Sequence, residues 1–227
     1  MRLYYMTSFD TATRYILSEK RMRISQFDRL NDPFELLSIR MNGKHERYVF
    51  KLLREHLVNS YGVLCMGKHW KSPLMWGHYG ENHKGICLGF DVPDGAATPM
   101  SYEPERLEHL IKMGEPAGGL TEPIIEQLLN TKYAQWAYEE EWRLILKLSD
   151  KDPINGEYYL NFGPELLLRE IVLGARCTAP VGSFRKLVGQ VDQSVTIIKA
   201  RAAFESFTIV RQKAVASIVV SPRGKKN

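Results

Sequence analysis

Three consecutive glutamates lie between two tryptophans in residues 136–143, Trp-Ala-Tyr-Glu-Glu-Glu-Trp-Arg. The segment is expected at a junction between a helix and a strand. Glu139 and Glu141 should share a face there, because side chains alternate along extended backbone. Two carboxylates on one face repel, which favours one with a raised pKa that acts as a general base and one that stays ionised. Arg143 is expected on the opposite face. The alternative is a solvated acidic turn in which Arg143 pairs with a distant carboxylate.

A second candidate is the turn Asn31-Asp32-Pro33-Phe34-Glu35. Asn and Asp side chains bond nearby backbone, and Pro33 keeps Asp32 out of the helical region. Such a turn holds Glu35 and backbone N–H groups at a fixed place, so Asn31 and Glu35 are candidate ligand-binding residues. A purely structural turn is the alternative.

A third candidate is the aromatic, glycine-rich segment of residues 75–85. Trp76 and Tyr79 are three apart, so on a helical turn they share a face and are suited to stack on a nicotinamide or adenine ring. The alternative is that both rings are core and the glycines end local elements.

No metal site is predicted. The chain holds zinc-type ligands, but their spacing fits no zinc ribbon or finger, and two of the cysteines lie in apolar runs. These residues are Cys65, His69, His78, His83 and Cys87. The chain also lacks the glycine-rich phosphate loops, the Gly-x-Ser-x-Gly elbow and the His-Glu-x-x-His pair.

These candidates must be positioned by one domain. The 227 residues are 44% hydrophobic and 25% charged, as in ordinary globular proteins. We expect a single α+β domain over residues 1–212 and a tail over 213–227. The net charge of +5 is mild and forms no dense basic stripe, so charge alone predicts no nucleic-acid module. Three cysteines and the lack of a signal peptide or an apolar membrane span favour the cytoplasm.

Periodicity predicts strands and helices that alternate without βαβ regularity. This favours an α+β fold with mixed, mostly antiparallel small sheets and flanking helices. The expected strands are 3–6, 23–25, 63–66, 85–90, 141–148, 170–173, 195–202 and 207–211. The expected helices are one capped by Asp10, then 44–60, 73–79, 104–113, 121–137 with Thr121 as N-cap, and 181–188.

Seven of these segments together resemble a large family of uncharacterised bacterial proteins. The resemblance covers about residues 3–202. Its motifs are a Tyr-His-Tyr-Thr-Ser-like strand, Asn-Asp-Pro-Phe-Glu, a Cys-Phe-Ser-like strand, Met-Trp-x-x-Tyr, Gly-x-x-Leu-Gly-Phe, Trp-x-Tyr-Glu-x-Glu-x-Arg and Glu-Ile-x-Leu-Gly. They correspond here to residues 3–8, 31–35, 63–67, 75–79, 85–90, 136–143 and 170–174.

The layout is also similar to that of ADP-ribosyltransferases. That resemblance implies NAD as substrate, Glu141 as the catalytic carboxylate and Glu139 as the residue that selects or activates the acceptor. It places Trp76 or Tyr79 against the nicotinamide. It also implies a first-strand residue on the NAD ribose, a role that falls here to Tyr5, where the family often has His, with Thr7 beside it. Asn31, Glu35 and Arg143 complete the expected ligand-binding set.

Two classes of function follow from this reading. The first is a transferase that moves ADP-ribose from NAD to a protein or nucleic acid, as a toxin or a phage-defence effector. The second is a binding module that holds a nucleotide or nucleic acid without catalysis. A third idea is a hydrolase or nuclease with a divalent metal near Asp32, Glu35 and Glu141. The sequence does not fix the acceptor or the oligomeric state.

Overall fold

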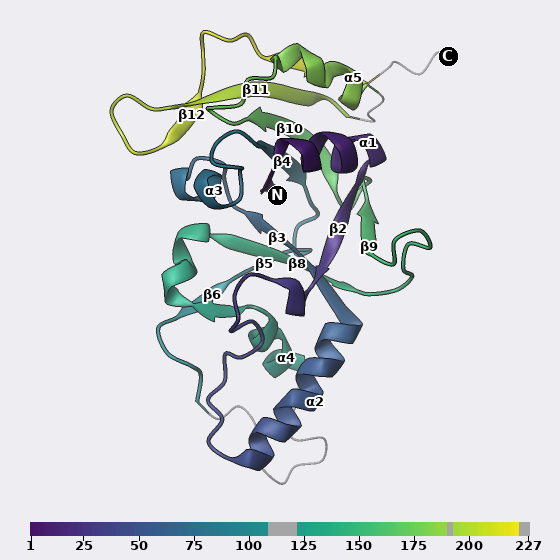
Figure 1. The fold of residues 1–227 in the computed structure, drawn as a ribbon, viewed down its shortest axis with the longest axis vertical. Coiled ribbons are helices and arrows are strands. Elements are labelled where there is room, and N and C mark those ends of the chain that lie inside the picture. The colour runs from purple at the N-terminus through teal and green to yellow at the C-terminus, as the bar shows by residue number, and fades with distance from the viewer. Residues whose placement is uncertain (109–121, 190–192, 223–227) are drawn as a thin grey trace. The chain divides into compact units, whose positions relative to one another are not determined.

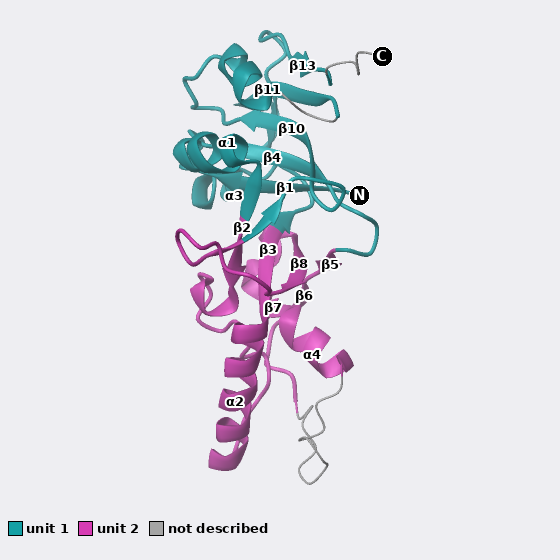
Figure 2. Ribbon diagram, turned by 90° about the vertical axis from the view of Figure 1, so that its right-hand side faces the viewer, with its two compact units in different colours: residues 1–22, 66–96, 159–227 teal, residues 23–65, 97–158 magenta. Residues whose placement is uncertain are grey.

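The computed structural model describes residues 1–108, 122–189 and 193–222, and the chain forms two compact units. Unit 1 comprises residues 1–22, 66–96 and 159–227, and unit 2 comprises residues 23–65 and 97–158 (Figure 2). Each unit buries a hydrophobic cluster of its own.

Unit 1 is built on a mostly antiparallel sheet in the order β12-β11-β10-β4-β1 (Figure 1). The one parallel pair in this series is β10 with β11. The strands are β1 (Arg2–Thr7), β4 (Ile86–Asp91), β10 (Leu167–Leu173), β11 (Val195–Ala202) and β12 (Ile209–Arg211). Strand β13 (Ile218–Val220) pairs antiparallel with β11, so the segment expected as a tail supplies a strand to this sheet.

Short helices accompany this sheet. A π-helical turn η1 (Thr11–Ile16) runs into α1 (Leu17–Glu19), and η5 (Val181–Ser183) runs into α5 (Phe184–Val188). Asp10 makes no side-chain cap bond, so the expectation for it is wrong. The Ser8 hydroxyl instead accepts the Thr11 N–H at 3.1 Å. Helix α3 (Pro73–His78) forms as predicted, with Ser72 as its N-cap and proline in its first turn.

Trp76 is the centre of the unit 1 core. It is fully buried against β4, β10, β11 and β12, and its indole N–H donates to the Trp70 carbonyl at 2.7 Å. Tyr4 and Met6 of β1 pack on the same cluster.

Unit 2 combines the long helix α2 (Lys44–Ser60), as predicted, with short strands. Antiparallel pairing joins β2 to β3 and β5 to β8, and β8 also pairs with β3. Strands β6 and β7 form a separate parallel pair. The strands are β2 (Arg21–Gln26), β3 (Tyr61–Gly67), β5 (Thr98–Pro99), β6 (Ser101–Glu103), β7 (Thr131–Tyr133) and β8 (Glu141–Lys147). The 3-10 turn η2 (Phe27–Arg29) also lies in unit 2, and strand β9 (Tyr158–Asn161) begins at the last residue of unit 2 and continues into unit 1.

The single helix expected over residues 121–137 is wrong. Helix α4 covers Glu122–Leu129, and β7 and the 3-10 helix η4 (Ala134–Glu139) follow it. The Asn130 amide and the Thr131 hydroxyl bond the carbonyls of Glu126 and Gln127, so side chains occupy the last turn of the helix.

The predicted helix over residues 104–113 is not found in residues 104–108, where Leu107 forms a single bridge with Ile39. Residues 109–113 and the proposed cap Thr121 lie outside the described residues. The fold class is otherwise as predicted, a mixed α+β chain with mostly antiparallel strands. Over the residues that the structure describes, no helix is long and apolar enough to cross a membrane.

Candidate functional site

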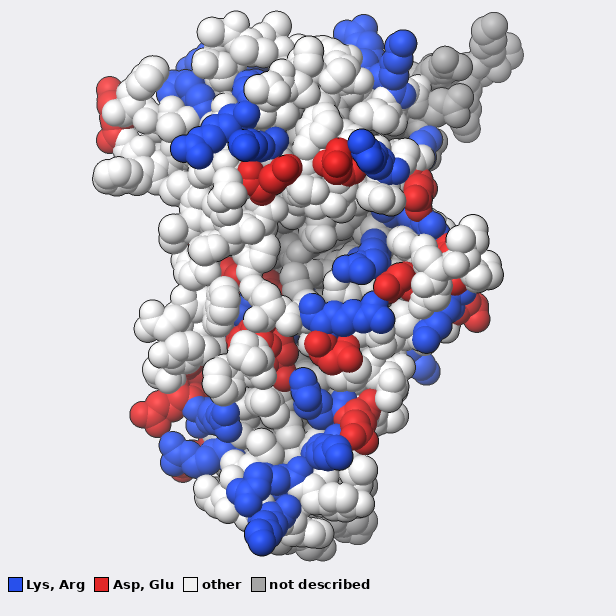
Figure 3. All heavy atoms as spheres, viewed as in Figure 1, with Lys and Arg blue, Asp and Glu red and all other residues white. Residues whose placement is uncertain are grey.

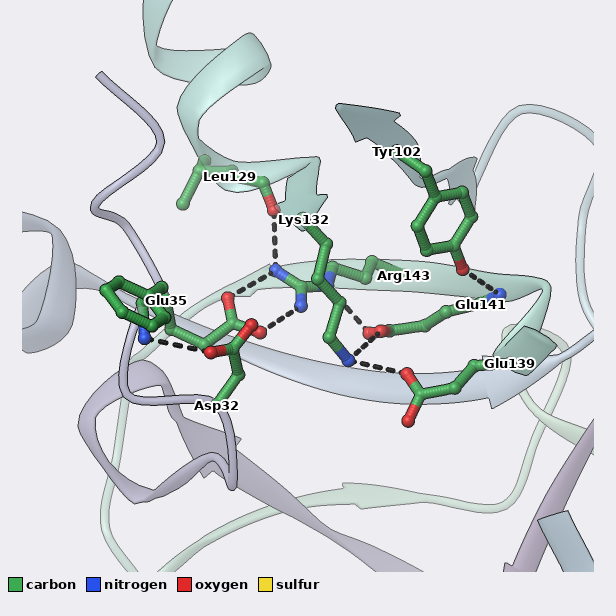
Figure 4. A network of polar contacts seen from close by, with 9 residues as sticks. Asp32, Glu35, Tyr102, Leu129, Lys132, Glu139, Glu141 and Arg143 are labelled. Atoms are coloured by element: carbon green, nitrogen blue, oxygen red, sulfur yellow. Dashed lines mark hydrogen bonds and ion pairs between the residues drawn. The ribbon is translucent and has the colours of Figure 1, made fainter. Parts of the chain in front are cut away.

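Five charged side chains of unit 2 are buried together (Figure 4). Each is between 0% and 5% exposed at its side chain. Three carboxylates and two cations give the group a formal net charge of −1. We call it the carboxylate cluster, and its members are Glu35, Lys132, Glu139, Glu141 and Arg143.

Within the carboxylate cluster, Arg143 binds both Glu35 and Glu141. Its Nη2 and Nη1 donate to the two Glu35 carboxylate oxygens at 2.6 and 3.0 Å, a bidentate pair. Its Nε donates to Glu141 at 2.7 Å, and Nη1 also reaches the Leu129 carbonyl at 2.8 Å. The guanidinium is therefore held in one orientation by three different segments of unit 2.

Lys132 binds both Glu139 and Glu141. Its ammonium donates to Glu139 at 2.5 Å and to Glu141 at 3.0 Å, and it lies 4.7 Å from the Trp136 ring centroid. One cation thus lies between the two glutamates that the sequence singled out. Glu139 and Glu141 both contact this ammonium, but they do not share a face of extended backbone as was expected.

The backbone explains that difference. Glu139 ends the 3-10 helix η4, so the two glutamates are not neighbours on extended backbone. Glu140 adopts the left-handed conformation with φ of 44° and is exposed, which turns the chain so that β8 begins at Glu141. Glu141 and Arg143 are two apart on β8 and lie on the same face. The expectation that Arg143 points to the opposite face is therefore wrong.

The alternative of a solvated acidic turn is half right. Arg143 does pair with a carboxylate distant in sequence, Glu35, but Glu139 and Glu141 are each only 5% exposed. Glu140 is the one exposed member of the three consecutive glutamates.

Burial and nearby charges together shift the pKa values of three members of the carboxylate cluster. Burial opposes ionisation of Glu141, but Arg143 and Lys132 outweigh it and lower the pKa of Glu141 to about 2. Burial raises the pKa of Glu35, and Arg143 offsets this rise only in part. Burial alone would lower the pKa of Lys132, yet Glu141 and Glu139 raise it well above its ordinary value. Glu141 is thus a permanently ionised carboxylate near neutral pH.

The turn of residues 31–35 delivers Glu35 to this cluster. The Asp32 carboxylate accepts the Phe34 N–H at 2.9 Å, and the Asp32 carbonyl accepts the Glu35 N–H at 3.1 Å. Glu35 points inward and is 3% exposed, while Asn31 is exposed. The structure therefore brings together Glu35, Glu139, Glu141 and Arg143 of the predicted set, with Asn31 at the entry of the turn.

Three members of this neighbourhood were missed by sequence reasoning. Lys132 lies within the helix that was predicted over residues 121–137, so the sequence did not single it out as a site residue. The Tyr102 hydroxyl accepts the Glu141 N–H at 2.8 Å, and nothing local marks that tyrosine. Cys65 was considered only as a hydrophobe or metal ligand. Burial and the nearby Glu141 raise the pKa of its thiol well above the ordinary value.

A cavity of about 270 Å³ lies in unit 2 and shares Lys132 with the carboxylate cluster. Its walls include the apolar side chains of Phe34, Leu37 and Pro104. The Arg106 guanidinium lies 5.3 Å from the Phe34 ring centroid. A cavity of this size with aromatic and cationic walls suits a single flat ring system.

The remaining predicted residues belong to unit 1. Tyr5 and Thr7 alternate along β1 with Tyr4 and Met6, which contact the Trp76 cluster, so they point to the other face of the strand. Within unit 1 the structure thus does not bring Tyr5 and Thr7 onto the face that carries Trp76. Tyr79 follows α3, is half-buried, and contacts His78 edge to face.

The chemistry of the cluster is that of a fixed charge array. In the described residues no group of three or more His, Cys, Asp or Glu is arranged to hold a metal ion. The oxygens of Glu35 and Glu141 instead accept hydrogen bonds from cations. Such an array can stabilise positive charge that develops on a ligand, because its dipoles are already oriented.

The chain was compared with known proteins. No curated protein matches it, and no solved structure matches it. A family model matches residues 75–144, a segment that contains Met75–Tyr79 and all of residues 136–143 but not the turn of residues 31–35. In agreement with the predicted resemblance to an uncharacterised family, the family that this segment matches is described as "Protein of unknown function (DUF2971)".

Proposed function

We propose that the chain is an ADP-ribosyltransferase-like enzyme that cleaves NAD and transfers ADP-ribose to a protein or nucleic-acid acceptor. The observation that carries the proposal is the carboxylate cluster, which is buried, ionised at Glu141 and net negative. A cytoplasmic toxin or phage-defence effector is the biological setting in which we place it.

The reaction needs a carboxylate beside a developing cation. The bond between ribose C1′ and the nicotinamide nitrogen breaks, and its electron pair leaves with nicotinamide. The sugar becomes an oxocarbenium-like cation, which a nearby carboxylate stabilises most where water is excluded. The acceptor nucleophile then bonds C1′ and releases its proton to solvent. The first step therefore requires no proton acceptor.

The contacts divide the roles of the two glutamates. The resemblance gives the direct role to Glu141. Both of its oxygens accept from cations, Arg143 on one and Lys132 on the other. Glu139 also bonds the Lys132 ammonium. Because both oxygens of Glu141 are engaged by cations, we assign to Glu141 the positioning of Lys132 and part of the negative field, and we propose Glu139, the second glutamate at that ammonium, for the contact with the ribose.

The flat ring of the ligand would bind in the cavity beside Phe34, with Lys132 joining that cavity to the cluster. At about 270 Å³ the cavity holds one ring system rather than a whole dinucleotide.

A test uses NAD labelled in its adenylate half, incubated with the protein and cell lysate. The proposal expects label on a macromolecule with the wild type and a loss of at least a hundredfold with Glu139→Gln. Glu140→Gln is the matched control, because Glu140 is adjacent, acidic and exposed. Equal labelling by all three proteins would rule the proposal out.

One observation favours a second candidate, a nucleotide-binding module without catalysis. All four carboxylate oxygens of Glu35 and Glu141 accept from Arg143 or Lys132, as expected of a cluster that only fixes the turn of residues 31–35 against β8. A module would bind NAD by calorimetry with no release of nicotinamide, and binding would survive Glu139→Gln. An enzyme would release nicotinamide with the wild type.

A further inference from the structure

Unit 1 contains a second candidate site that shares no residue with the carboxylate cluster. A cavity of about 590 Å³ is lined by His83, Arg176 and the loop of residues 202–209, which joins β11 to β12. Arg176 also lines a neighbouring cavity of about 390 Å³ together with Lys84 and Glu81. The first volume lies in the range of small-molecule sites.

The loop presents two aromatic rings to solvent. Phe204 is 90% exposed and Phe207 is 102% exposed, although a phenylalanine side chain is normally buried. Both line the larger cavity. The Arg201 guanidinium lies 4.3 Å from the Phe204 ring centroid. Exposed rings accompanied by cations are the usual platform on which nucleobases stack.

Arg176 supplies a cation at the same cavity. It is exposed, and among the residues that the structure describes its guanidinium takes part in no ion pair. Its backbone N–H donates to the His83 carbonyl at 2.9 Å, which holds the two lining residues next to each other. A guanidinium without a carboxylate partner is suited to bind a phosphate through two parallel hydrogen bonds.

His83 is held by unusual backbone. Glu81, Asn82 and His83 all have positive φ, at 51°, 52° and 70°, which is costly for residues other than glycine. Contacts within unit 1 impose this turn: the Glu81 carboxylate accepts the Phe9 N–H at 2.9 Å, and the Trp76 carbonyl accepts the His83 N–H at 3.1 Å. The imidazole stacks on Trp76 with 15° between the rings.

The imidazole of His83 is suited to contact a ligand in its uncharged form. Burial and the nearby Arg176 lower its pKa, so near neutral pH the ring donates and accepts hydrogen bonds without adding charge. Strained backbone that fixes such a side chain at a cavity is typical of ligand-binding sites.

From these features we propose that the larger cavity of unit 1 binds a nucleotide, with its phosphate on Arg176 and its base against Phe204 and Phe207. The ligand is either a free mononucleotide or one unit of a single-stranded nucleic acid. The proposal goes beyond the carboxylate chemistry of unit 2 and does not depend on it.

Calorimetric titration of the full chain tests this with adenosine 5′-monophosphate, adenosine, inorganic phosphate and a short single-stranded oligoadenylate RNA. We expect the monophosphate to bind more tightly than adenosine or phosphate. Arg176→Gln and Phe207→Leu should each weaken it about tenfold. Arg185→Gln, at an exposed position of α5 in the same unit, is the matched control and should bind as the wild type does.

The two sources of the nucleotide are separated by the RNA arm. Tighter binding of the RNA than of the monophosphate assigns the site to a strand, and equal binding assigns it to a free nucleotide. Binding unchanged by Arg176→Gln and Phe207→Leu overturns the proposal, as does phosphate that binds as well as the monophosphate or no binding of either nucleotide probe. Glu139→Gln should leave this binding intact, which separates its outcome from that of the proposed function.

Discussion

At the scale of single residues, the carboxylate cluster gives one arginine two partners that the sequence places far apart. The motif of residues 139–143 and the turn of residues 31–35 meet because Glu35 and Glu141 bind the same guanidinium. The sequence identified both segments as functional candidates. It could not reveal their pairing, since no local pattern encodes a contact across more than a hundred residues.

Replacing Glu35 should expose how much this pairing stabilises the fold. Glu35→Gln leaves the fully buried Arg143 with Glu141 as its one carboxylate, and we expect a loss of about 3 kcal/mol in the free energy of unfolding. Denaturant titration measures it. The control is Glu157→Gln. Arg29 Nη1 donates to both Glu157 oxygens at 2.8 and 2.6 Å, and Arg23 lies 3.7 Å away, but these arginines are about half exposed. The control should lose about 1 kcal/mol or less. Equal losses would contradict the role given to burial.

The pKa of Glu141 predicts a dependence of stability on pH. Its pKa falls from 4.5 to about 2 in the folded chain, so the ionised form stabilises the fold above the unfolded value and this contribution is lost as pH falls toward 2. The difference in unfolding free energy between wild type and Glu141→Gln should be constant above about pH 5 and should shrink by up to about 3 kcal/mol toward pH 2. A difference that stays the same from pH 7 to pH 2 would show that Glu141 is not held by cations.

At the scale of elements, periodicity located helix α2, whose buried residues Phe50, Leu53 and Leu57 recur at intervals of three and four. Strand β8 also formed where expected, although its buried positions are Glu141, Arg143 and Leu144, so its two faces do not separate polar from apolar residues. The segment of residues 121–137 failed because Asn130 and Thr131 end α4 early and residues 131–133 then pair with β6. Residue propensities describe local preference, so they cannot predict a pairing with a strand that is distant in sequence. For the same reason, Lys132 was not among the predicted site residues.

The backbone at Gly174 packs closely against the turn of residues 81–83, and a substitution at Gly174 tests this packing. A Cβ at Gly174 would lie 2.3 Å from the His83 carbonyl oxygen, so Gly174→Ala must displace that turn. We expect a loss of about 2 kcal/mol or more in unfolding free energy, measured by thermal or denaturant unfolding. Gly163→Ala in the same unit is the control, since a Cβ there meets nothing within 4 Å. A Gly174→Ala protein as stable as the control would disprove this packing.

At the scale of the whole molecule, the chain divides its chemistry between two units. Unit 2 holds the carboxylate cluster, and unit 1 holds the cavity around Arg176 and Phe207. On the face drawn in Figure 3, Lys and Arg are interspersed with Asp and Glu over each unit, in line with the mild net charge. The sequence did not indicate this division. Each unit is assembled from segments that alternate along the chain, so no change in composition marks a boundary between the units.

The interleaved segments predict how the chain responds to truncation. Unit 1 takes β10, β11, β12 and β13 from residues 159–227, and Trp76 packs against three of these strands. A chain that ends at residue 158 should therefore lose the near-ultraviolet circular dichroism that buried Trp76 contributes. A truncated chain that keeps this signal and unfolds cooperatively would contradict the assignment of these strands to the unit 1 core.

The central claim is that the buried carboxylates of unit 2 perform chemistry on NAD rather than only hold the fold together. The most direct measurement is nicotinamide released from NAD by purified wild type, Glu139→Gln and Glu140→Gln, with the folded fraction of each protein measured alongside. We expect release by wild type and Glu140→Gln, and at least a hundredfold less by folded Glu139→Gln. No release by wild type, or equal release by folded Glu139→Gln, would contradict it.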